Sequence, residues 1–171
     1  MGDEVAVTNV KGNIGHTDLD DIANPSLNHL GVFVSDIEEI QRYLKKYWGI
    51  TEFQTLDYHP GYTDEDRMKI GAPFSLHMAN CYLFGQLLHI SECLDEDGVL
   101  RMNYPHWWWH LKQNRDVIQH ICISVDNWEK VTETLKGRGL RCYASHSYEG
   151  RRWAHFGDGA GGFAVEIEER V

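Results

Sequence analysis

The sequence predicts an α+β fold made of two copies of one β-α-β-β-β unit. The first observation is a weak internal repeat, in which residues 28–34 (NHLGVFV) are echoed by residues 119–125 (QHICISV). The second is that each run leads into a helical pattern in the same register, without a gap. The third is that each copy closes on an apolar strand with one polar residue able to bind a metal, His89 or Glu166.

In the first copy, residues 27–34 are typical of a strand and residues 36–47 of a helix. Ser35 and Glu38 form a capping box, and Gly49 supplies a stop signal. The apolar stripe of this helix consists of Ile37, Ile40, Leu44 and Tyr47. Strands are expected at residues 51–56, around 75–78 and at 82–92, with a polar turn region at 57–66.

The second copy repeats this order. Residues 119–125 predict a strand, and residues 127–136 predict a helix that ends at Gly137 or Gly139. Three further strands are expected near residues 141–145, 153–156 and 163–168.

A chain of 171 residues fits one domain, or two small modules that share a core. We expect a flexible N-terminal extension at residues 1–25, a first module at 26–94, a connector at 95–116 and a second module at 117–171. The connector carries the aromatic run Trp107, Trp108 and Trp109. Such a run more often caps a core or seals an interface than contacts substrate.

The formal net charge of −10 disfavours binding to nucleic acid or to an anionic membrane surface. No stretch has the roughly 20 apolar residues needed to cross a bilayer, and the acidic start lacks the pattern of a signal peptide. The four cysteines show no Cys-x-x-Cys spacing, which favours reduced, mostly buried thiols. We therefore expect a soluble cytoplasmic protein.

Strand alternation places four candidate metal ligands on equivalent faces. Because successive side chains point to opposite faces of a strand, the aliphatic residues of each strand face the helix and His29, His89, His120 and Glu166 face away from it. If the two sheets face each other around a cleft, these side chains converge there. Three imidazoles and one carboxylate suit one divalent ion, with Zn, Fe, Mn, Ni and Co all remaining candidates.

With these residues in place, the chain resembles the vicinal oxygen chelate superfamily, the glyoxalase/bleomycin resistance/extradiol dioxygenase fold. The resemblance covers about residues 27–169 and rests on the His29 unit, the His120 unit and the glycine turn at 157–163 that precedes the strand with Glu166. It implies two paired modules forming an open, metal-lined barrel. It also implies His29, His120 and Glu166 as ligands, whereas His89 stands where glyoxalase I and methylmalonyl-CoA epimerase usually carry Glu or Gln.

The resemblance implies a metal that chelates adjacent oxygens of a small carbonyl substrate. The first hypothesis is an epimerase, isomerase or glyoxalase-like lyase that moves a proton through a metal-stabilised enolate. Candidate proton-transfer residues are His146, His155 and Tyr148, with Glu92 and Glu168 more consistent with structural or solvated positions. The aromatic residues favour an apolar or aromatic substrate, the fold frequently forms homodimers, and no glycine-rich phosphate loop indicates a nucleotide cofactor.

Two alternatives remain open. In a non-haem Fe(II) dioxygenase, His29, His120 and Glu166 would form the metal triad and His89 would act beside it. The characteristic Tyr and Asp-Pro pair of extradiol dioxygenases are absent from this sequence. In a metal-independent binding or resistance protein no ligand set is needed, and the complete set of ligand-capable residues argues against that class.

Overall fold

The computed structural model describes residues 23–58, 68–70, 75–94, 108–109, 112–113, 117–148, 150–157 and 164–170. The first half of the chain contains β1 (Ser26–Val34), α2 (Ile37–Trp48), β2 (Gln54–Tyr58), β3 (Met68–Ile70), β4 (Leu76–Leu83) and β5 (Gln86–Cys93). The second half contains β6 (Val117–Val125), α5 (Trp128–Gly137), β7 (Arg141–Tyr148), β8 (Arg151–Gly157) and β9 (Ala164–Glu169).

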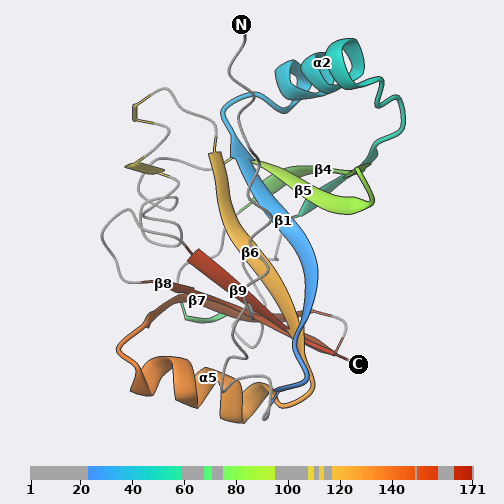
Figure 1. Cartoon of the computed structure of the whole chain (residues 1–171). Helices are drawn as coiled ribbons and strands as arrows, with labels where there is room; N and C mark the ends of the chain where they lie inside the picture. Colours follow the sequence, from blue (N-terminus) through green and yellow to red (C-terminus); the bar gives the residue numbers. More distant parts are fainter. Residues whose placement is uncertain are drawn as a thin grey trace, which may run out of the picture.

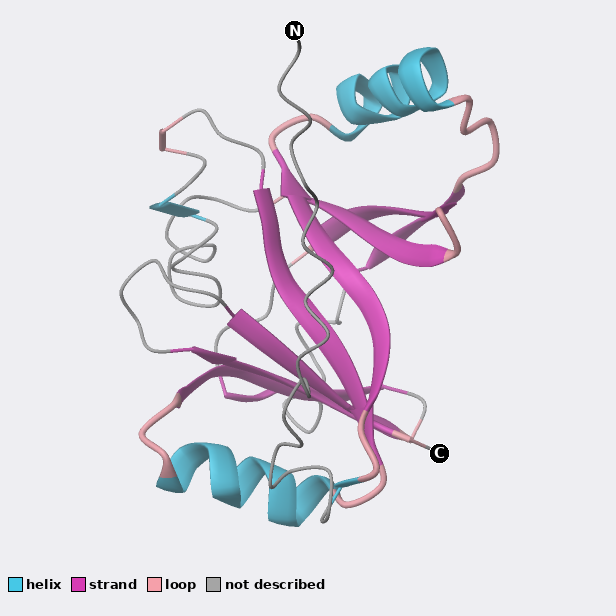
Figure 2. Cartoon of the chain, in the orientation of Figure 1, coloured by secondary structure: helices cyan, strands magenta, loops and turns pink. Residues whose placement is uncertain are grey.

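The strands form one mixed sheet in the order β2-β4-β5-β1-β6-β9-β8-β7-β3 (Figure 1). Its two halves join where β1 and β6 run antiparallel, and each of these strands has a parallel neighbour, β5 and β9 respectively. The helices lie at opposite ends of the molecule, outside the strands (Figure 2). The predicted α+β class, with two paired halves in an open arrangement, is therefore confirmed.

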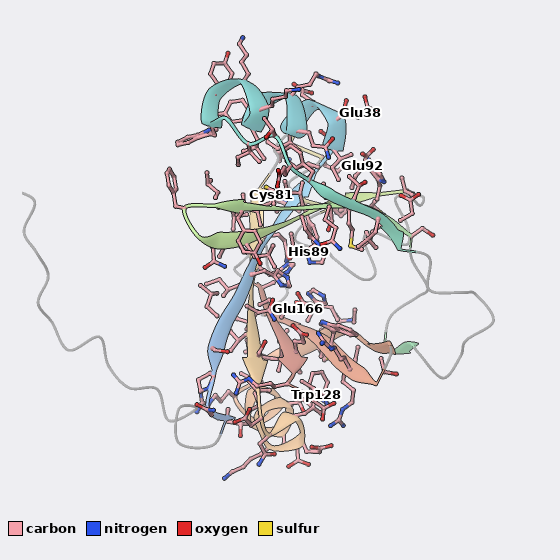
Figure 3. The ribbon with its side chains drawn as sticks, turned by 90° about the vertical axis from the view of Figure 1, so that its right-hand side faces the viewer. Glu38, Cys81, His89, Glu92, Trp128 and Glu166 are labelled. Carbon is pink, nitrogen blue, oxygen red and sulfur yellow. The ribbon has the colours of Figure 1, made fainter. Side chains whose placement is uncertain are left out.

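Two hydrophobic clusters attach the helices to the strands. The α2 cluster buries Val34, Ile37, Leu44, Ala79, Cys81, Leu88 and Ile90. The α5 cluster buries Val125, Trp128, Val131, Leu135, Ala154, Phe156 and Ile167, together with Ala23. Figure 3 shows Cys81 on the α2 side of the β4–β5 hairpin, with His89 on the opposite side facing Glu166. The helices thus occupy one face of each half-sheet and leave the inner face for polar chemistry.

Three local expectations were wrong. The cap of α2 is Asp36, whose side chain accepts a hydrogen bond from the Glu39 amide, because Ser35 lies one residue too early. The stretch expected as one strand at 82–92 contains the end of β4, a turn at Phe84 and Gly85, which both adopt positive φ, and most of β5. A short strand, β3, was missed, and it pairs with β7 in the other half of the sheet.

Other parts of the chain are only partly described. Residues 1–22 of the expected extension and most of the 95–116 connector lie outside the described residues, so the module boundaries stay a prediction. Ala23 is buried, and its carbonyl accepts a hydrogen bond from the Asp126 amide. All four cysteines are free. Within the described ranges, no helix is long and apolar enough to cross a membrane.

The position of the α2 cap can be tested with two substitutions. Asp36→Ala removes the acceptor for the Glu39 amide and should lower the free energy of unfolding by about 1 kcal/mol. Asp36→Asn keeps an acceptor there and should cost only a few tenths of a kcal/mol. Urea unfolding followed by circular dichroism measures both, and equal losses would place the cap elsewhere.

Candidate metal centre

Three adjacent strands bring two imidazoles and a carboxylate to one point. His29 lies on β1, His120 on β6 and Glu166 on β9, and all three are buried. Glu166 Oε2 lies 3.1 Å from His29 Nε2 and 2.9 Å from His120 Nε2, and the two Nε2 atoms are 3.3 Å apart. The sheet order β1-β6-β9 therefore joins the three residues expected to be the safest ligands.

Two β-bulges orient the imidazoles. The β1–β6 register skips Asn28 on one strand and Gln119 on the other, which leaves each residue as the extra member of a bulge. Asn28 Oδ1 lies 3.0 Å from His29 Nδ1, and Gln119 Oε1 lies 2.6 Å from His120 Nδ1. Asn28 Nδ2 donates to Ser124 Oγ and to a Glu168 carboxylate oxygen, which fixes the orientation of that amide.

The amide oxygens place the Nδ1 proton of each imidazole. With Nδ1–H donating to the amide oxygen, a singly protonated ring presents the lone pair of Nε2 toward Glu166, which is the form that binds a metal. Three atoms rich in electrons then lie within 3.3 Å of one another in a buried site. A single cation between them satisfies all three at once.

The donor set fits a divalent ion. Ligand atoms that lie about 2.1 Å from one ion are about 3 Å apart when their bonds are at right angles. The three separations of 2.9, 3.1 and 3.3 Å match that spacing. Amide oxygens on Nδ1 are also the outer contacts that metal-binding histidines commonly make.

Glu166 is ionised despite its burial. Burial opposes the charge, but the facing His155 and the contacts with His120 and His29 hold the pKa of Glu166 well below its usual value. The Cys122 thiol shows the reverse, because burial and the carboxylates of Glu166 and Glu168 raise its pKa. Cys122 therefore stays protonated beside the cluster, although its sulfur lies close enough to His29 and Glu166 to belong to a ligand-capable group.

Gly31 makes room for the His120 ring. It pairs with His120 across the β1–β6 ladder, and a Cβ atom on Gly31 would overlap the imidazole. The ring also packs edge-on against Phe33, with centroids 5.5 Å apart. Gly31 is thus a spacing requirement of the site.

His89 occupies the position in the first half that Glu166 occupies in the second. Its pairing partner is Gly31, two residues beyond His29, just as the partner of Glu166 is Cys122, two residues beyond His120. The His89 and His29 rings lie 4.8 Å apart between centroids, but His89 Nε2 points at Met78 Sδ at 2.9 Å. Burial and the nearby His29 lower the pKa of His89 to about 4, so its imidazole is neutral near pH 7.

His155 lies beside the cluster on β8. Its Nε2 is 3.6 Å from Glu166 Oε1, and its ring packs edge-on against His120 with centroids 5.1 Å apart. His155 pairs with Glu166 across β8 and β9, and Asn80 pairs with His89 across β4 and β5. His155 and Asn80 therefore hold equivalent positions in the two copies. Asn80 Oδ1 is buried, and among the described residues it has no hydrogen-bond partner.

A cavity of about 330 Å³ opens over these side chains. Its apolar wall consists of Phe33, Leu56, Leu76, Met78, Leu87 and Trp153, and its polar side chains include Asn28, Asn80, Ser91, Arg151 and Glu168 as well as the histidines and Glu166. The cavity has the size and mixed lining of a small-molecule site.

Several candidate residues lie elsewhere. The backbone of His146 and Tyr148 is part of β7, but their side chains lie outside the described part of the structure. Trp108 and Trp109 are not among the described residues that line the cavity, and Trp107 is not described. Glu92 has the structural role expected of it, since it accepts a hydrogen bond from the Ile37 amide at the start of α2.

Glu168 was expected to be solvated, and this was wrong. It is buried, lines the cavity, and contacts Asn28 at 2.6 Å and Arg151 Nη1 at 3.3 Å. The alternation that turns Glu166 inward turns Glu168 inward as well, so the sequence did contain the signal. The amide residues before His29 and His120 were also visible in the repeat, whereas the bulges that turn them inward were not.

The family assignment follows from a comparison with protein-family models. Residues 28–156 match the Glyoxalase/Bleomycin resistance protein/Dioxygenase superfamily. The chain therefore belongs to this superfamily, as the sequence resemblance predicts. A search of curated proteins found no match.

Solved structures show the same fold at low sequence identity. A hypothetical protein of Bacillus halodurans aligns with a TM-score of 0.57 at 14% identity, covering 86% of this chain and 95% of the other. Methylmalonyl-CoA epimerase from Mycobacterium tuberculosis aligns with a TM-score of 0.52 at 18% identity, covering 85% and 87%. A Streptomyces coelicolor methylmalonyl-CoA epimerase variant in complex with 2-nitronate-propionyl-CoA aligns with a TM-score of 0.51 at 14% identity, covering 85% and 94%.

Gly31→Ala tests the space beneath His120. The added methyl group must displace the imidazole, so divalent-metal affinity should fall about 10- to 100-fold or more. Isothermal titration with Zn²⁺ measures this. Gly137→Ala is the matched control, because its added Cβ meets open space at the end of α5. Equal zinc affinities in the two variants would contradict the role given to Gly31.

The amide next to His120 provides a second test. Gln119→Leu removes the acceptor for Nδ1–H and should weaken zinc binding about 10- to 100-fold, whereas Gln119→Glu keeps an acceptor and should retain it. Competition with a chromophoric chelator gives both constants. Tight zinc binding by the Leu variant would show that Gln119 does not orient the ring.

Proposed function

We propose that this protein is a metal-dependent enzyme that moves a proton on the carbon next to a carbonyl group, as an epimerase, isomerase or glyoxalase-like lyase. The observation that carries the proposal is the convergence of His29 Nε2, His120 Nε2 and Glu166 Oε2 at the end of a small cavity. When bound, a divalent ion would polarise adjacent substrate oxygens and stabilise the negative charge that develops on them. The identity of the ion is left open among Zn, Fe, Mn, Ni and Co.

We assign four residues to the ion, His29, His89, His120 and Glu166. His29, His120 and Glu166 converge in the structure. His89 is included because its pairing position in the first half repeats that of Glu166 in the second. The neutral state of His89 also suits a ligand, since an imidazole binds metal through a lone pair.

We assign His155 to the proton transfer. It lines the cavity, lies against the ring of His120 and faces Glu166 Oε1, so it is close to any substrate held at the centre. In the proposed reaction His155 accepts a proton from the carbon beside the carbonyl, which leaves an enolate, and returns it to the same or a neighbouring carbon. His146 and Tyr148 remain candidates for a second proton carrier, as the sequence predicts.

The cavity lining supports an apolar or aromatic substrate. Six apolar side chains line the cavity, and an apolar lining excludes water from a developing enolate. The similar epimerase structures share this fold and include a complex with a CoA derivative, which is consistent with carbonyl chemistry on this scaffold. The homodimer and cytoplasmic location expected from the sequence belong to the same proposal, and light scattering and cell fractionation test them.

The second candidate is a non-haem Fe(II) dioxygenase. The observation in its favour is the position of His89 Nε2 at Met78 Sδ, which leaves two histidines and one carboxylate as the convergent set. That set is the ligand pattern of many Fe(II) oxygenases. Oxygen uptake with iron-loaded protein and candidate phenols distinguishes it from proton transfer, which consumes no O₂.

Removal of any convergent ligand should remove the metal. We expect purified protein to contain close to one divalent ion per chain, and His29→Ala, His120→Ala and Glu166→Ala each to lose it, because a buried lone pair or charge disappears in each case. Plasma emission spectrometry on protein prepared without chelators measures the content. Full occupancy in all three variants would contradict the site.

His89 and His155 should separate binding from proton transfer. His89→Ala should weaken metal binding, whereas His155→Ala should keep the metal and slow solvent deuterium exchange into a carbonyl substrate about 100-fold or more. Exchange is followed by proton magnetic resonance. A His155 variant that exchanges at the wild-type rate would remove it from the mechanism.

A further inference from the structure

We propose that Arg151 binds the anionic end of the substrate, so that the site selects a monoanion carrying two adjacent oxygens attached to an apolar body. This inference rests on the proposed function and adds a substrate class and a specificity residue to it. Arg151 is the only Arg or Lys among the described residues that line the cavity.

The contact of Arg151 with Glu168 leaves several guanidinium N–H donors available for a ligand. Among the described residues, its guanidinium makes one polar contact, from Nη1 to Glu168 Oε1 at 3.3 Å, and its side chain is 56% exposed. A guanidinium has five N–H donors, and a carboxylate commonly takes two of them. Arg151 can therefore keep its contact with Glu168 and still bind a substrate carboxylate.

Arg152, the next residue along β8, has the contacts of an arginine with a structural role. Arg152 uses Nε and Nη2 on Glu169 and Nη1 on Glu129, and its guanidinium lies over the ring of Trp128. These contacts fasten β8 and β9 to α5. Arg151 has no comparable set of contacts among the described residues, so a role in holding strands and helix together does not explain its position.

The charge of the loaded cavity also favours an anion. Glu166 and Glu168 oppose Arg151 and a divalent ion, which leaves one net positive charge facing the cavity when both carboxylates are ionised. Burial and the nearby Glu166 raise the pKa of Glu168, so the cavity is no less positive than this count. In a partly buried site this charge favours a ligand with one negative charge over a neutral one of the same shape. Arg151 is also linked to the centre, because Glu168 contacts Asn28 and Asn28 contacts His29.

The test compares acids with their neutral, isosteric amides. The probes are 3,4-dihydroxybenzoate, 3,4-dihydroxyphenylacetate and 3-(3,4-dihydroxyphenyl)propanoate, each with its amide, bound to zinc-loaded protein without oxygen and measured by calorimetry. A catechol presents two adjacent oxygens, and the three spacers place the carboxylate at different distances. The wild type should bind at least one acid about five- to tenfold more tightly than its amide, as expected for one half-exposed charged pair.

Arg151→Gln should bring the ratio of acid affinity to amide affinity close to one. Its zinc content and its affinity for the amide should stay within about twofold of the wild-type values. Arg42→Gln removes the same charge from an exposed position on α2 and should leave the ratio unchanged. Raised salt should lower the wild-type ratio and not that of Arg151→Gln.

The proposal is overturned if the wild type binds each acid no better than its amide, if it binds neither, or if Arg151→Gln weakens acid and amide equally. The last result would show that Arg151 only supports Glu168. These failures differ from failure of the proposed function, in which the protein would lack a divalent ion or would not exchange substrate protons.

Discussion

The structure depends on one electrostatic constraint, the crowding of two imidazole nitrogens and a carboxylate oxygen within 3.3 Å of one another. Buried groups with lone pairs repel one another unless a proton or a metal cation lies between them. The strand order, the two bulges and the absence of a side chain at Gly31 all serve to bring these three atoms together. The hydrophobic clusters beneath α2 and α5 hold the strands in that order and have no polar part in the site.

The bulges connect the sequence repeat to this constraint. In a regular strand, Asn28 and His29 would point to opposite faces, and so would Gln119 and His120. One extra residue on each strand lets both members of the pair reach the inner side. The amide–histidine dipeptide is therefore the functional unit of the repeat, since each copy supplies an imidazole together with the group that fixes its proton.

The sequence was sufficient for the fold class and for the β-α-β order that opens each half, because these follow from periodicities of two and 3.6 residues. Alternation also placed His29, His120 and Glu166 on the inner face, and the family resemblance separated these three from His89. The sequence was insufficient where a conformation depends on contacts between distant parts of the chain. The pairing of β3 with β7 joins residues far apart in sequence, and the bulges arise only when β1 and β6 meet. The cap of α2 at Asp36 in place of Ser35 is a one-residue choice between two good capping residues. Glu168 was misplaced for a different reason: its closeness to the end of the chain outweighed the alternation that it shares with Glu166.

The two copies differ in charge, and under the proposed function this difference would orient the substrate. His89 and Asn80 of the first half correspond to Glu166 and His155 of the second, and Ser91 corresponds to Glu168. Every charged Arg or Glu among the described cavity residues comes from the second half, whereas five of the six apolar wall residues come from the first. A substrate that is both apolar and anionic can satisfy this cavity in one direction only, with its apolar body against β2, β4 and β5 and its charge toward β8. In the proposed reaction, the carbon that exchanges its proton would lie between these two ends, beside His155, because the three convergent residues lie where the two halves meet. Two equivalent modules thus form an asymmetric cavity, and the proposed removal of a proton from one particular carbon depends on such a fixed substrate orientation.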